Sequence, residues 1–199
     1  YGHALLESGI LEASDVQVTA SSVTHKGTIT SSKVIFSELT QLSGNDGTIQ
    51  ASELVLEGKA SRFPDVSMGG KNNQISKVSL NGSFNDIKIR SAQMMQLQSQ
   101  VGSEMEQTST VQIQKGDFRT DSGNLSLSIS FSPISTVLDS SMVLAAKTGS
   151  IEVANRDSLL NYGQVLVYGN NVMEEVATGF PELDEDWYVL NATSLDFDS

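Results

Sequence analysis

The stretch Gly27–Phe36, with the sequence GTITSSKVIF, is repeated 20 residues later as Gly47–Leu56, with the sequence GTIQASELVL. The same order of apolar, polar and small residues occurs before these copies at Leu11–Val18 and after them at Ile89–Met95. One copy is too short to bury its own apolar residues, so a core can form only when copies stack on one another. The repeat therefore predicts coils or hairpin rungs stacked along one axis.

Each copy is predicted to form two short strands joined by a corner of small residues. Side chains two positions apart in a strand share a face, so Ile49 and Ala51 point the same way. Leu54 and Leu56 reach that face only if the alternation shifts by one residue at the corner. A later segment, Leu125–Phe131, alternates cleanly and is predicted to be one half-buried strand. The residues predicted to be buried are Ile29, Ile49, Leu54, Leu56, Leu127 and Ile129.

The composition also favours strands over helices. The 199 residues include 16 Gly, only 3 Pro and many Ser, Thr, Gln and Asn residues, whereas a helical bundle would be richer in Ala, Leu, Glu and Lys. The predicted fold class is therefore all-β, an elongated repetitive β-sheet architecture with at most one or two short helices. A β-solenoid, a β-jellyroll and a sandwich of stacked rungs all remain open. Residues 1–173 are expected to form this repetitive β domain.

Several turns and local elements can be predicted from short signals. The dipeptide Asn81-Gly82 predicts a tight hairpin and local antiparallel pairing, and Asp46-Gly47 predicts a hairpin or coil turn. Between Arg62 and Asn73, Pro, Gly-Gly and Asn-Asn predict a loop insertion. Mixed apolar spacing makes Ile134–Lys147 the best helix candidate, and the apolar Ala4–Leu6 predicts a terminal strand or a helical turn.

The charge and the missing residue types exclude several classes of protein. The net charge is −12, from 12 basic and 24 acidic residues, so a basic groove for nucleic acid is not expected. There is no cysteine, which excludes disulfides and thiolate metal sites. A cysteine-free chain fits the cytoplasm and also fits secreted bacterial repeat proteins. No apolar run is long enough to span a membrane as a helix, and no signal peptide is visible.

Catalytic motifs are not found in the sequence. It contains no nucleophile elbow, P-loop, dinucleotide fingerprint or zinc-protease motif, and an enzyme is not expected. The two histidines, His3 and His25, are interpreted as ordinary surface residues. Asn45–Ile49 followed by Glu53 matches the second half of a calcium-binding EF-hand loop, but the first half is missing, so a turn is the better interpretation.

The C-terminal residues 174–199 differ in composition from the rest of the chain. Acidic residues are interleaved with aromatic ones, which is typical of a segment that caps a stack, docks on a neighbour or holds calcium. No other cofactor is expected. The calcium ligands would be Asp184, Asp186, Asp196 and Asp198. The docking residues would be Trp187, Tyr188, Val189, Leu190 and Phe197, placed against the chain's own last rungs or against a second copy.

The repeated sequence segment resembles the rungs of two known families. Ile29–Phe36 and Ile49–Leu56 are similar to the rungs of β-helical haemagglutinin-type adhesins of two-partner secretion. Ala13–Val16 and Ala51–Leu54 are similar to phrases of the periplasmic lipopolysaccharide-bridge family related to LptA and LptC. The resemblance implies a location that is extracellular, at the cell surface or periplasmic. It transfers no functional residue to this chain.

Two functions follow as hypotheses. The first is a non-enzymatic extracytoplasmic structural or adhesive module, a subunit of a larger assembly whose partner is another protein or a second copy. The alternative is a periplasmic lipid carrier or bridge protein, in which the rungs open into an apolar β-groove. Lipid that co-purifies with the chain would favour the carrier, and oligomers without lipid would favour the assembly subunit.

Overall fold

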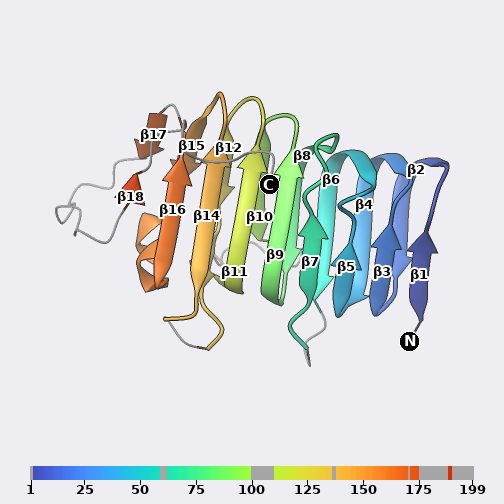
Figure 1. Ribbon diagram of the computed structural model, residues 1–199, viewed down its shortest axis with the longest axis horizontal. Coiled ribbons are helices and arrows are strands. Elements are labelled where there is room, and N and C mark those ends of the chain that lie inside the picture. Colours follow the sequence, from blue (N-terminus) through green and yellow to red (C-terminus); the bar gives the residue numbers. More distant parts are fainter. Residues whose placement is uncertain are drawn as a thin grey trace, which may run out of the picture.

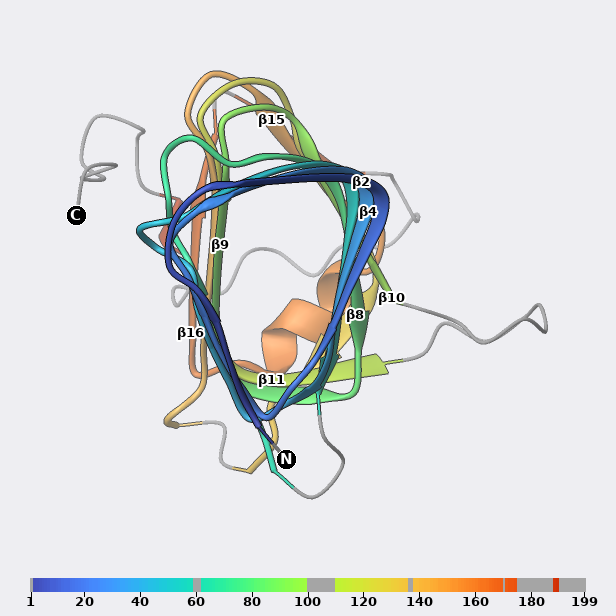
Figure 2. The ribbon, with the colours of Figure 1, turned by 90° about the vertical axis from the view of Figure 1, so that its right-hand side faces the viewer.

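The structure is a computed structural model that describes residues 2–58, 62–99, 110–135, 138–169, 171–174 and 188–189. It is a parallel β-solenoid of about seven turns (Figure 1). Figure 2 looks along the stack and shows coils of roughly triangular outline laid over one another. The all-β, repetitive architecture predicted from the sequence is confirmed, and of the alternatives left open it is the solenoid that forms.

Two parallel sheets contain all the strands that the structure describes. The 10-stranded sheet contains β1 (His3–Leu6), β3 (Ser22–His25), β5 (Gln41–Ser43), β7 (Asp65–Met68), β9 (Ser83–Ser91), β11 (Thr110–Thr120), β13 (Ser130–Ser132), β14 (Ser141–Ala146), β16 (Gln164–Tyr168) and β18 (Tyr188–Val189). The 8-stranded sheet contains β2 (Ile10–Thr19), β4 (Thr28–Leu39), β6 (Thr48–Gly58), β8 (Gln74–Asn81), β10 (Met95–Ser99), β12 (Leu125–Ser128), β15 (Ser150–Val153) and β17 (Asn171–Glu174).

The repeat sets the register of the stack. Leu11 on β2 pairs with Ile29 on β4, which pairs with Ile49 on β6, so equivalent positions of the three phrases form one column. Val34 and Leu54 form a second inward column beyond the corner. The predicted one-residue shift is confirmed, because both parts of each phrase face inward although they differ in phase.

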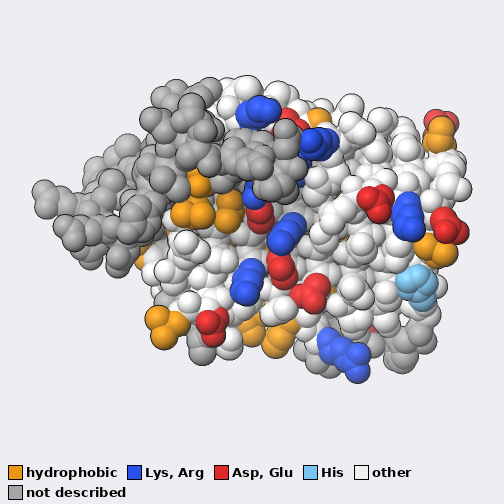
Figure 3. All heavy atoms as spheres, in the orientation of Figure 1, with side chains coloured by type: hydrophobic (Ala, Val, Ile, Leu, Met, Phe, Trp, Pro, Cys, Tyr) orange, Lys and Arg blue, Asp and Glu red, His pale blue; other side chains and the backbone are white. Residues whose placement is uncertain are grey.

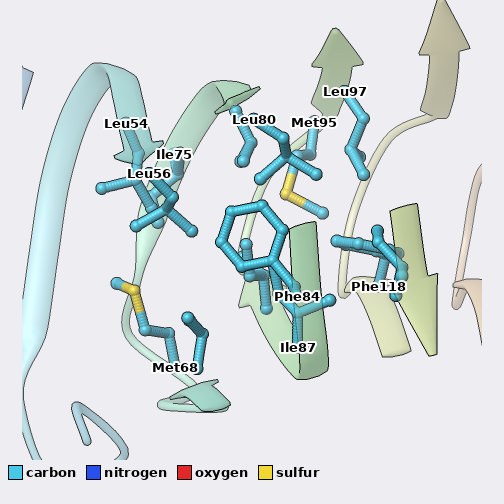
Figure 4. Close-up of a cluster of buried hydrophobic side chains, with 14 of the residues drawn as sticks. Leu54, Leu56, Met68, Ile75, Leu80, Phe84, Ile87, Met95, Leu97 and Phe118 are labelled. Carbon is cyan, nitrogen blue, oxygen red and sulfur yellow. The ribbon is translucent and has the colours of Figure 1, made fainter. Parts of the chain in front are cut away.

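The inward columns fill the solenoid with one continuous apolar core. All six residues predicted to be buried are at most 2% exposed. Figure 4 shows the middle of this core, where side chains from both sheets meet, with Phe84 close to Leu80, Ile87 and Met95. Because each coil covers the next, the stack supplies the burial that one coil cannot achieve alone.

The predicted hairpin at Asn81-Gly82 is wrong. These residues turn the chain from β8 into β9, which belong to different sheets, and every strand pairing in the described ranges is parallel. Gly82 has a φ of 96°, a conformation that glycine adopts at little cost, so the dipeptide provides a sharp corner. The other Gly-containing turn, Asp46-Gly47, is a coil turn between β5 and β6.

Three other local predictions also need correction. The helix predicted over Ile134–Lys147 is absent from the described part of that range, where strand β14 buries Met142 and Leu144 in alternation. The single strand predicted at Leu125–Phe131 is split into β12 and β13, which lie in different sheets. The predicted insertion between Arg62 and Asn73 contains strand β7 and so belongs to a coil. Ala4–Leu6 lies in a strand, the first of its two alternatives.

One short 3-10 helix, η1 (Arg156–Asn161), is the only helix in the described residues. The next residue, Tyr162, donates a hydrogen bond from its hydroxyl to the backbone carbonyl of Ile113, at 2.9 Å. Burial raises the pKa of the Tyr162 hydroxyl. None of the described helices is long and apolar enough to cross a membrane.

Candidate interaction surfaces

The first coil leaves two strand edges open at one end of the solenoid. Strand β1 pairs only with β3, and β2 pairs only with β4, among the residues that the structure describes. The outer backbone N–H and C=O groups of both strands can therefore accept a further strand. Strand β2 is long for such an edge, at 10 residues. Open edges of this length are where other chains add to a sheet.

Apolar side chains are exposed at the same end. Leu11 is 41% exposed, whereas Ile29 and Ile49 in the same inward column are 1% and 0% exposed. Leu5 and Ile10 are also large exposed hydrophobic residues of this coil, whereas Val16 on the same strand as Leu11 is buried, at 6% exposure. Strands β1 and β2 have a neighbouring strand on one side only in the described residues, and we call them together the open coil.

A ladder of charges runs across the outer face of the 8-stranded sheet. Glu53 lies between Lys33 and Lys77, with oxygen–nitrogen distances of 3.2 and 3.4 Å, and it accepts a hydrogen bond from Ser79 at 2.7 Å. Burial raises the pKa of the Glu53 carboxyl, but these three partners outweigh burial and leave the pKa below its ordinary value. The Glu53 carboxylate is therefore paired with the two lysines and with Ser79, and these contacts hold neighbouring coils in register.

The outer face of the 10-stranded sheet carries a shallow polar cleft. It has a volume of about 290 Å³, and its lining includes Asp65, Asp86 and Lys88. Asp65 and Asp86 are paired in register on β7 and β9. Burial raises the pKa of Asp86, Lys88 at 4.0 Å opposes this, and Asp65 adds to it. Figure 3 shows acidic and basic side chains intermixed over the middle of this face.

A second cleft of about 160 Å³ adjoins the first and shares Lys88. Its two arginines are already engaged. Arg90 donates to both carboxylate oxygens of Asp121, at distances from 2.7 to 3.2 Å, and Arg119 binds Asp117 at 2.7 Å. The Arg90–Asp121 fork joins two adjacent coils, whereas Arg119 and Asp117 lie two residues apart on the same strand, β11. They leave little free charge for an anionic ligand.

His25 lies inside the solenoid near the open coil, so its interpretation as a surface histidine is wrong. It is 1% exposed, and its Nε2–H donates to the carbonyl oxygen of Thr48 at 3.2 Å. Its Nδ1 has no hydrogen-bond partner among the described residues. Gly47 leaves room for the ring, because a Cβ there would stand 2.8 Å from the His25 carbonyl oxygen and would also meet the imidazole. A protonated ring would leave its Nδ1–H buried without an acceptor among the described residues, which is costly.

Acid should therefore weaken the fold through His25. Burial lowers its pKa in the folded chain, despite the hydrogen bond to Thr48, whereas the unfolded chain titrates near the ordinary value of about 6.5. As the pH falls through that value, the unfolded state gains a proton that the folded state does not, and stability drops. Urea midpoints at pH 7.5 and 5.5 should differ more for the unmodified chain than for His25→Asn. The exposed His3→Asn should keep the full difference, and an equal difference in all three proteins would contradict this account.

The predicted C-terminal sites lie almost wholly outside the described residues. This applies to the calcium candidates Asp184, Asp186, Asp196 and Asp198, and to the docking candidates Trp187, Leu190 and Phe197. For Tyr188 and Val189 the backbone is described: they form β18, which pairs in parallel with β16 and extends the 10-stranded sheet. At these two residues the segment lies against the chain's own last coils. In the described ranges, no group of three or more His, Cys, Asp or Glu side chains could hold a metal ion.

The clefts could not be predicted from the sequence. Asp65 and Asp86 belong to no motif, and only the coil register brings them together. The chain matches no family model, no curated protein and no solved structure. The surfaces themselves must therefore carry the functional argument.

Proposed function

We propose that this chain is a non-enzymatic extracytoplasmic structural or adhesive β-solenoid module that serves as a subunit of a larger assembly. The observation that carries the proposal is the continuous apolar core, which side chains from both sheets fill through the described coils. The rung-level resemblance to β-helical adhesins supports the extracytoplasmic setting.

The lipid-carrier alternative ranks second. A carrier needs apolar surface that stays open for an acyl chain, and the interior of the described coils is instead filled by side chains such as Phe36, Phe84 and Phe118, all 0% exposed. The large exposed hydrophobic residues in the described ranges belong to different elements, among them Ile10 on β2, Leu138 before β14 and Leu160 on η1.

Native mass spectrometry of the full chain at rising protein concentration tests the proposal. We expect concentration-dependent oligomers that carry no lipid. A monomer at every concentration, with bound acyl lipid, would overturn the proposal in favour of the carrier.

A further inference from the structure

A second hydrophobic cluster lies outside the main core, on the outer face of the 10-stranded sheet. It contains the buried Ala145 and Tyr168, with Leu166 packed against them. Their neighbours on the same strands, such as Leu144 and Val167, belong to the main core. Since side chains alternate between the two faces of a strand, the residues of the second cluster point outward. We call the apolar outward residues of β14 and β16 the outer patch: Val143, Ala145, Leu166 and Tyr168.

The same positions are polar in the coils that precede the outer patch. The residues that precede Val143 in register are Ser43, Ser67, Lys88 and Asp117. Arg119 precedes Ala145 in the same way. Figure 3 shows this change as charged side chains over β9 and β11 and hydrophobic ones over β14 and β16. A contiguous apolar patch on an outward face is typical of a surface that packs against something.

The outer patch is covered. Ala145 is 0% exposed and Tyr168 is 3% exposed, as core residues are. The neighbours of Tyr168 within the patch, Ala145 and Leu166, are smaller than its ring and cannot enclose it. Figure 2 shows no described helix against this side of the sheet, because η1 lies within the outline of the coils. The cover must therefore come from a part of the chain outside the described ranges.

We infer that residues 190–199, which we call the strap, lie across the outer patch. Strand β18 pairs with β16 in a register that places Val189 beside Val167. The strap begins at the next residue, level with Tyr168 at the border of the patch. Strands β18 and β14 are two strand spacings apart, about 10 Å, whereas ten extended residues span up to about 33 Å. The strap is therefore long enough to cross the whole patch.

The sequence of the strap suits an extended segment on an apolar surface. Leu195 and Phe197 are two positions apart, so an extended chain presents both side chains to the same side. Asp196 and Asp198 then point the other way, toward water. Lys147, which directly follows β14, places a positive charge at the border of the patch, and this favours an acidic segment there.

Two other segments outside the described ranges fit the outer patch less well. Residues 100–109 lead into β11 at Thr110, whereas the patch lies beside Arg119 near the other end of that strand. Nine residues of strand separate these two points, about 30 Å. Residues 175–187 connect β17 in one sheet to β18 in the other, so their course is set by that crossing. The strap has no such constraint beyond β18.

Thiol labelling of single-cysteine variants tests the inference, because the chain contains no cysteine. Ala145→Cys should react with a maleimide roughly tenfold or more slowly than Ser43→Cys, an exposed position on the same face. Adding Leu195→Ser and Phe197→Ser should bring the two rates to within about twofold, because the cover is lost. Thr193→Ser is the control change within the strap and should leave the slow rate. Equal urea midpoints show that the coils remain folded in every variant.

Disulfide trapping gives a second measurement that needs no change to the rest of the strap. Ala145→Cys combined with Phe197→Cys should form an intramolecular disulfide under mild oxidation, because the two side chains are in contact. Ser43→Cys combined with Phe197→Cys should not, since β5 lies four strands from β14 in the sheet.

Three results would overturn the inference. The first is fast labelling of Ala145→Cys when the strap is unchanged. The second is slow labelling that persists after Leu195→Ser and Phe197→Ser, since another segment or a partner would then be the cover. The third is a labelling rate that rises on dilution, which would make a second copy the cover. The proposed function is tested separately, by the mass of the assembly and by bound lipid.

Discussion

Replacing Phe84 with alanine should lower the free energy of unfolding by about 3–5 kcal/mol. The Phe84 side chain is 0% exposed and lies between Leu80, Ile87 and Met95, with side chains from both sheets around it (Figure 4). Removing the ring deletes buried apolar area and leaves a cavity that the stiff coils on either side cannot close. Urea unfolding followed by circular dichroism measures the loss.

Phe63→Ala is the matched control for this experiment. Phe63 is 49% exposed, so removing its ring should change the free energy of unfolding by much less than removing the ring of Phe84. Equal losses for the two variants would mean that the inward and outward faces are assigned wrongly around β9. The comparison is clean because both substitutions remove the same atoms.

The second large effect is expected at Asn73, which joins two coils from inside the core. Asn73 is 0% exposed. Its Oδ1 accepts a hydrogen bond from the Ile49 N–H at 2.9 Å, and its Nδ2 donates to the Met68 carbonyl at 3.2 Å. Asn73→Ala removes both hydrogen bonds at once, and each buried backbone group that it leaves unsatisfied costs about 1–3 kcal/mol, so the expected loss is up to about 6 kcal/mol.

Hydrogen exchange gives this prediction a local signature. The Ile49 amide should lose protection in Asn73→Ala more than its neighbours do, because its acceptor has gone. Asn72→Ala is the control, since Asn72 is exposed and adjacent in sequence. If Asn73→Ala unfolds at the same urea concentration as Asn72→Ala, the side chain does not hold the coils together as described.

The stacked β fold could be predicted from the part of the sequence where the repeated copies are most alike. Ile29 and Ile49 lie in identical surroundings 20 residues apart, and such a repeat makes stacking the simplest way to bury both. Prediction from the sequence failed where one short motif is compatible with two structures. Asn81-Gly82 supports a hairpin and also a corner between sheets, and only the neighbouring coils decide between them. The apolar spacing of Ser141–Ala146 could be read as a helix because the period is too short to be distinctive.

Contacts between coils were harder to predict than the fold. The burial of His25 was not foreseen, because nothing in its local sequence says that Gly47 in the next coil makes room for the ring. Register across coils is a property of the whole stack, and single positions carry little information about it.

The central claim, a parallel stack in a fixed register, is tested most directly by distances between neighbouring coils. Gln50 pairs with Gln74, and Glu57 pairs with Asn81, on strands β6 and β8. Since the chain has no cysteine, spin labels can be attached to two double-cysteine variants, one for each pair. Parallel neighbours lie about 4.8 Å apart, so both variants should show strong dipolar broadening. An antiparallel arrangement that brought the first pair together would separate the second by many residues along the strands, and broadening in only one variant, or in neither, would contradict the parallel solenoid.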